Sequence, residues 1–474
     1  MEHFRKSIEI RESLLDEEAQ TTSEESFIHI DDIGLESIIL KYGKLIECYE
    51  DSLPLMKLLS GDTHEDVAIL STRMGHIYSK MHDWDNSIGS YQAALKVMQQ
   101  ISENKNVDIE IAKLLHRRGE IYIFREEYNE AQKCLTRCLS LYKKIYGDDS
   151  TEVAMAMFSL GISYSKLKDH QQSMLLFTES LKKLKIKASR RDIRIGHILH
   201  WLGRGHQELL QYNQALSRYL SALRVYKHNT SIVDPAVVVH TLHFIGDVYF
   251  KKHNYDLSLK CYNEEIKLIE TRLNDGRLSP ADAMVCVGDI YAKKDQFEDS
   301  LNFYKNSIEF ISNCDEKQKL KYAHTLSKIG TMYSKCEKYE DAVNAYQEAH
   351  EMLNMIYDSD DNQIAAVAFK LGRVLDKASK YDEAKTFYDE SLRIRKLNLG
   401  CNVEDVAEVL FSLGKNYRER MELNESINAL QSVSLLSLLF YLNCHSIFVL
   451  LYLSFIYVCL FNLCMSRHWK YAGN

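Results

Sequence analysis

The chain has 474 residues, of which 46% are hydrophobic and 27% are charged, and its formal net charge is −8. Only 3 residues are proline, which favours helices over turn-rich β architecture, so an all-α fold is expected. Of the 59 basic and 67 acidic residues, 6 and 14 lie in residues 1–60, which leaves 53 of each in the rest; a body with no basic excess argues against a nucleic-acid-binding protein.

The first 62 residues divide into two predicted segments. Residues 1–34 contain acidic and Ser/Thr clusters such as LLDEEAQTTSEESF and no sustained periodicity, which predicts an acidic, largely disordered leader. Residues 35–62 place apolar side chains at helical spacing. Because the end of a repeat array needs a cover, these residues are predicted to form an amphipathic capping helix.

A glycine recurs at intervals of 42 to 44 residues between positions 63 and 431. The nine glycines of this signature are Gly75, Gly119, Gly161, Gly203, Gly246, Gly288, Gly330, Gly372 and Gly414. Twelve residues after each glycine the side chain is always Ser or Ala, and sixteen after it the side chain is Tyr, Phe or Leu. The positions twelve and sixteen residues after the glycine fall on one face of a helix, and small residues let two helices approach closely. Each of the nine repeats is therefore predicted to be a helical hairpin.

This pattern resembles the tetratricopeptide repeat, and the 42-residue period is similar to that of kinesin light chains and related scaffold proteins. The resemblance implies a right-handed superhelix, an α-solenoid of about nine hairpins. The paired Asn residues of kinesin light chains are absent, since the matching pairs include Thr72-Arg73 and His116-Arg117. No long heptad coiled coil precedes the repeats, so the chain is not expected to be kinesin light chain itself.

The resemblance also implies where a partner would bind. In such repeats the first helices of the hairpins line a concave groove, at positions six and three before and one and four after each signature glycine. The candidate groove residues are His116, Phe158, His200, Arg204, His243, Phe250, Phe369, Arg373, Phe411 and Lys415. A groove of aromatic and charged residues suits capture of an extended or helical peptide segment, although some of the Phe residues could instead pack between helices.

Four histidines are the one constellation that could hold a metal ion. His197 and His200 have i, i+3 spacing in the fourth repeat, and His240 and His243 take equivalent positions in the fifth repeat. No carboxylate or thiol in the motif supports them, so peptide contact or plain surface remain the alternatives, and no metal or other cofactor is predicted. No catalytic motif is found in the chain, so an enzyme is not expected either.

The end of the chain, residues 432–474, is an apolar tail in which no Asp, Glu, Lys or Arg follows Glu425 until Arg467. Residues 446–464 are long and apolar enough to cross a bilayer. Val433-Ser434 is also how a common splice-donor sequence reads in frame, and pyrimidine-rich codons would encode the Leu, Phe, Tyr, Ser and Cys residues that follow. A membrane anchor, a translated intron and a buried helix therefore all stay open.

Together these features predict a non-catalytic scaffold or adaptor that binds peptide segments of other proteins. The 11 Cys residues include no CxxC pair, which suits reduced thiols and a cytoplasmic location. The alternative is a receptor or tether anchored in a membrane through residues 446–464, with its repeats facing the cytosol. The sequence does not indicate an oligomeric state.

Overall fold

The computed structural model describes residues 35–101, 105–189, 191–273, 278–311, 316–398 and 403–441. Every secondary-structure element of these residues is an α-helix, which confirms the predicted all-α class. The chain divides into two compact units, Met1–Ser279 and Pro280–Asn474, which we call the first and second units and describe separately.

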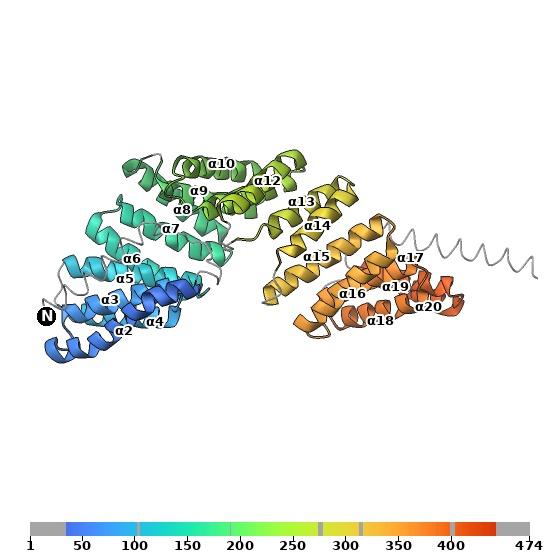
Figure 1. The fold of residues 1–474 in the computed structure, drawn as a ribbon, viewed down its shortest axis with the longest axis horizontal. Helices are drawn as coiled ribbons and strands as arrows, with labels where there is room; N and C mark the ends of the chain where they lie inside the picture. The colour runs from blue at the N-terminus through green and yellow to red at the C-terminus, as the bar shows by residue number, and fades with distance from the viewer. Residues whose placement is uncertain are drawn as a thin grey trace, which may run out of the picture. The chain divides into compact units, whose positions relative to one another are not determined.

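In the described residues of the first unit, helix α2 (Leu35–Ser60) precedes five hairpins, each packed against the next (Figure 1). Helix α2 packs on α3. The hairpins are α3 (Glu65–Lys80) with α4 (Trp84–Met98), α5 (Lys105–Phe124) with α6 (Tyr128–Tyr146), α7 (Thr151–Lys166) with α8 (His170–Lys187), α9 (Ile193–Glu208) with α10 (Tyr212–His228), and α11 (Pro235–Lys251) with α12 (Tyr255–Arg272).

The second unit repeats the same architecture, with four hairpins between residues 281 and 441. They are α13 (Ala281–Lys293) with α14 (Phe297–Glu309), α15 (Glu316–Lys335) with α16 (Tyr339–Ile356), α17 (Asn362–Lys377) with α18 (Tyr381–Leu397), and α19 (Val403–Glu419) with α20 (Leu423–Tyr441). Helix α20 continues past residue 431, where the sequence placed the end of the array, because Val433 is buried in a cluster with Val406 and Leu410.

Close contact at the signature glycines joins the two helices of every hairpin. A Cβ atom added at Gly203 would lie 2.6 Å from the ring of Tyr219, the residue sixteen positions later. The same partner position is met at all nine glycines, at 2.5 to 3.0 Å. In four hairpins the residue twelve after the glycine is a serine whose hydroxyl donates to the glycine carbonyl at 2.7 to 2.8 Å, as Ser300 does to Gly288. The size pattern in the sequence therefore corresponds to one helix-packing geometry.

The turn inside each hairpin contains a left-handed residue that is never glycine. Nine residues have φ between 57° and 64°, and each comes seven residues after a signature glycine: His82, Glu126, Lys168, Leu210, His253, Asp295, Glu337, Ser379 and Met421. The N–H of the next residue donates to the carbonyl five positions earlier, as from Gln211 to His206 at 2.8 Å, which is the Schellman pattern that ends the first helix. Without glycine, this conformation costs about 1 kcal/mol or more per turn.

Two predicted segments lie outside the described residues: the leader at 1–34 and the candidate transmembrane segment at 446–464. Among the helices that are described, none combines the length and the apolar composition needed to cross a bilayer.

Candidate functional site

The predicted groove residues form two separate sets, because they lie on the first helices of hairpins in different units. In the first unit they are on α5, α7, α9 and α11: His116, Phe158, His200, Arg204, His243 and Phe250. In the second unit they are on α17 and α19: Phe369, Arg373, Phe411 and Lys415. We call these the first-unit surface and the second-unit surface.

Arg204 is held by aromatic rings at the centre of the first-unit surface. Its guanidinium lies 4.6 Å from the ring centroid of Trp201 and 5.2 Å from that of Phe244 on α11. Phe244 in turn stacks on Tyr219, with centroids 5.8 Å apart and planes 11° apart. Such cation–π contacts fix the charged group in place while leaving its N–H donors free to bind a ligand. Trp201 and Phe244 were not among the predicted groove residues, although both are bulky aromatics two residues before a signature glycine.

Two histidines beside Arg204 are held by hydrogen bonds and rings. His200 Nδ1 lies 3.0 Å from the hydroxyl of Thr241, and its ring lies 5.4 Å from that of Phe244. Burial, together with the nearby charge of Arg204, lowers the pKa of His200 to about 3, so this side chain is neutral at physiological pH. His243 Nδ1 lies 3.1 Å from a carboxylate oxygen of the buried Glu265.

The four histidines of the candidate metal site are not gathered into a metal centre. Nowhere in the described part of the chain does the structure bring together three or more His, Cys, Asp or Glu side chains that could hold a metal ion. His197 instead lies 3.2 Å from the hydroxyl of Tyr226, and burial lowers its pKa to about 4. His200 and His243 are engaged by Thr241 and Glu265, so three of the four rings serve local packing.

The remaining first-unit residues differ in what they present to solvent. Phe158 is only 1% exposed and packs on Phe177 at 5.7 Å, which makes it an interior residue. Phe250 is half-buried and packs on Tyr255 at 5.8 Å. His116 Nε2 lies 3.0 Å from the Ser159 hydroxyl in the next repeat, and burial lowers its pKa.

On the second-unit surface, cations lie over phenylalanine rings. Arg373 is 57% exposed and lies 5.7 Å from the ring of Phe369, while Lys415 is exposed and lies 4.4 Å from the ring of Phe411. Phe369 itself is 5% exposed, and Arg395 covers it from α18 at 4.9 Å. This surface therefore presents Arg373, supported by the buried Phe369, and Lys415, supported by Phe411.

A polar network lies beneath each surface and was not predicted. In the second unit, Tyr388 donates to Asp376 at 2.7 Å, and Asn416 Nδ2 donates to the same carboxylate at 2.7 Å; burial raises the pKa of Asp376. In the first unit, Tyr219 donates to Gln207 at 2.9 Å. A tyrosine sixteen residues after the glycine, combined with a polar residue four after it, is the sequence signal for this bond.

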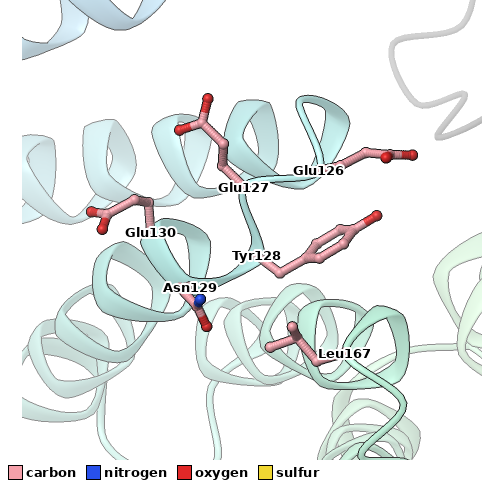
Figure 2. Close-up of a pocket in the computed structure, with 6 residues that line it drawn as sticks. All are labelled: Glu126, Glu127, Tyr128, Asn129, Glu130 and Leu167. Carbon is pink, nitrogen blue, oxygen red and sulfur yellow. The ribbon is translucent and has the colours of Figure 1, made fainter.

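A shallow hollow at the α5–α6 turn lies outside the groove positions (Figure 2). Three glutamates line it, but their carboxylates point in different directions, away from one another. Glu127 pairs with Arg125 at 2.8 Å, and Glu130 pairs with Lys133 at 2.5 Å. The hollow therefore has no converging set of groups that could bind an ion or a substrate.

These features define a class of protein: an array of helical hairpins whose first helices carry fixed charges over aromatic rings. A family model described as the tetratricopeptide repeat matches residues 110–185, 279–355 and 321–397. The repeats in these residues are accordingly tetratricopeptide repeats, as the repeat pattern predicted.

Curated relatives come from a plant. Protein KINESIN LIGHT CHAIN-RELATED 2 of Arabidopsis thaliana is 22% identical over 184 residues, which are 39% of this chain and 28% of that protein. Protein KINESIN LIGHT CHAIN-RELATED 1 of the same plant is 21% identical over 182 residues, which are 36% of this chain and 29% of that protein. The aligned region thus spans under a third of each relative, and the resemblance to the kinesin light chain type of repeat is confirmed as a distant one.

A solved structure shows the same fold. It is a signal-transduction ATPase with numerous domains that carries a tetratricopeptide repeat sensor, from Pyrococcus horikoshii. It matches with a TM-score of 0.54 at 14% identity over 76% of this chain and 52% of that one. At this identity the likeness bears on the fold alone.

Proposed function

We propose that the protein is a non-catalytic scaffold that binds peptide segments of partner proteins on the first helices of its repeats. One observation carries this proposal: Arg204, Arg373 and Lys415 all stand one residue after a signature glycine, and each lies over an aromatic ring. A cation packed on an aromatic ring thus recurs at one position of the repeat in both units.

A cation packed on an aromatic ring suits peptide recognition for two physical reasons. A cation that already rests on a ring loses little freedom when it binds, which lowers the cost of association. Arginine and aromatic side chains are also the residues in which binding energy is most often concentrated. A bound segment would bury apolar side chains beside Phe411 or Phe244, and its acceptors would meet Arg373, Lys415 or Arg204.

The test starts from peptides selected from a random library on the purified full chain, with binding measured by fluorescence anisotropy. For peptides on the second-unit surface, Arg373→Ala with Lys415→Ala is expected to weaken binding at least about tenfold. Arg393→Ala with Lys396→Ala removes the same charge from exposed positions on α18 and should leave binding unchanged.

Peptides that bind the first-unit surface should instead weaken with Arg204→Ala. The proposal fails if the library gives no binders. It fails equally if the α18 control weakens binding as much as the groove variants do, because the charge would then act without regard to position.

A cytoplasmic location is part of this proposal, and a membrane-anchored tether is its alternative. The alternative rests on residues 446–464, an apolar run of 19 residues in the sequence. Carbonate extraction of membranes from cells that make the full chain separates the two. An anchored chain stays with the membranes, whereas a cytoplasmic chain is released.

A further inference from the structure

Three consecutive inter-repeat loops of the first unit lie side by side. They connect α6 to α7, α8 to α9, and α10 to α11. Lys183 at the end of α8 reaches Asp148 and Asp149 in the first of these loops, at 3.3 Å from Asp149. Asn229 Nδ2 in the third loop donates to the carbonyl of Arg191 in the second at 2.8 Å. We call this continuous surface the loop edge; it contains none of the groove positions.

Apolar side chains recur along the loop edge. Tyr146 at the end of α6 is 41% exposed, Ile186 in the last turn of α8 is 65% exposed, and Ile232 in the third loop is 58% exposed. Each loop therefore presents one large apolar side chain to solvent. Single exposed apolar residues are ordinary, but a row of three on joined loops forms a surface that could be covered.

The charge around Ile186 is positive. Between Lys182 and Arg194 the sequence has seven basic residues and one acidic residue. Lys185, Lys187 and Arg191 are exposed, and none of them is in ion-pair contact with a carboxylate of the described residues. The two acidic groups of the first loop are already paired, since Lys143 and Lys183 contact Asp148 and Lys183 also contacts Asp149. Lys183 is therefore not one of the free cations of this edge.

The second unit shows that this charge is not a general property of the repeat. Its loop between α16 and α17 reads YDSDD over residues 357–361. Met355, in the last turn of α16, is 77% exposed there, so an apolar side chain stands beside acidic rather than basic groups. At the end of α18, however, Leu397 is 62% exposed beside the exposed Lys396, so single pairs of this kind also occur in the second unit. The loop edge of the first unit differs in joining three exposed apolar side chains with three unpaired cations.

We infer that the loop edge binds an anionic membrane surface. Ile186 and Ile232 enter the headgroup region, and Lys185, Lys187 and Arg191 contact lipid phosphates and carboxylates. Basic residues near an anionic leaflet and apolar side chains at the interface both strengthen such binding, and the two contributions add. Duplex nucleic acid would use the same cations but would gain nothing from the isoleucines. This inference goes beyond the peptide-binding proposal and uses a different face.

The test is co-sedimentation of the purified full chain with vesicles of phosphatidylcholine, with or without phosphatidylserine. Wild-type protein is expected to bind at least about tenfold better when phosphatidylserine is present. Lys185→Glu, Lys187→Glu and Arg191→Glu together should abolish that preference. Ile186→Ser with Ile232→Ser should weaken binding about tenfold while the preference for phosphatidylserine remains.

The matched control reverses three exposed lysines of the second unit, Lys293→Glu, Lys317→Glu and Lys338→Glu, and should bind like wild type. Because all of these side chains are exposed, circular dichroism and the unfolding temperature should stay unchanged. Three results would each overturn the inference: equal binding to vesicles without phosphatidylserine, equal loss in the control, or vesicle binding that is insensitive to the isoleucines and fully displaced by duplex DNA. None of them bears on peptide selection, so the two proposals can fail independently.

Discussion

The two units both have an arginine one residue after a signature glycine, but the surroundings of that arginine differ. Arg204 in the first unit lies between Trp201 and Phe244, among histidines that burial keeps neutral. Arg373 in the second unit is 57% exposed and lies over a single buried ring. The hairpin geometry is shared, because the glycine contact is the same in both units. The difference shows that the repeat fixes the backbone while leaving the chemistry of the first helix free to vary.

Acidification should produce the largest difference in stability between the two units. The folded pKa values of His200 and His197, about 3 and 4, lie below the value near 6.5 of an unfolded histidine, so the unfolded chain binds more protons as the pH falls. The free energy of unfolding is therefore unaffected by these rings above about pH 6.5 and falls at lower pH. At pH 5 the loss is as much as about 4 kcal/mol for the two histidines together.

The second unit should respond in the opposite direction at Asp376, whose folded pKa is raised, because protonation relieves the cost of burying its charge. Hydrogen exchange of amides in α9 and in α17, compared between neutral and acidic pH after correction for intrinsic rates, measures both responses. If α17 loses as much protection as α9, the assignment of the effect to the histidines is wrong.

The glycine contact offers a matched pair of substitutions with the next largest effect. Gly203→Ala would push a methyl group against Tyr219, which is fixed by Gln207 and Phe244, and should lower the free energy of unfolding by about 2 kcal/mol. Gly414→Ala meets the flexible Leu430 at 3.0 Å.

For Gly414→Ala, the gain in helix propensity, about 1 kcal/mol, should offset most of the cost of the contact. Urea denaturation of the two variants gives both values. A larger loss at Gly414 than at Gly203 would contradict this account of the contact.

The smallest expected effect is a gain in stability at the left-handed turn. Leu210 has φ of 58° and is 70% exposed, so Leu210→Gly removes backbone strain without removing a buried contact. The variant should be more stable by about 1 kcal/mol, and Met421→Gly should gain a similar amount in the second unit. Leu209→Gly, at φ of −82°, is the control that should not gain. Thermal unfolding of the three variants would disprove the strain if Leu209→Gly gained as much as Leu210→Gly.

The sequence predicted the hairpins well because their packing depends on residue size at fixed offsets. Gly203, a small residue twelve later and Tyr219 sixteen later can be read directly from the chain. The left-handed turn could not be predicted in this way, since its nine residues share no side-chain type and the conformation is imposed by the Schellman hydrogen bonds.

The candidate site was predicted less completely because position alone does not decide exposure. Phe158 and Phe411 both stand three residues before a signature glycine, yet Phe158 is buried against Phe177 while Phe411 lies at the surface under Lys415. The division near residue 279 was also not foreseen, since the 42-residue spacing from Gly246 to Gly288 continues through it unchanged.

The most direct test of the peptide-binding account is amide hydrogen exchange of the full chain with and without a peptide selected from the library. The account predicts that a saturating peptide slows exchange in first helices, in α17 and α19 for a peptide on the second-unit surface and in α9 and α11 for one on the first-unit surface. Protection confined to second helices such as α18, or to the inter-repeat loops, would contradict it.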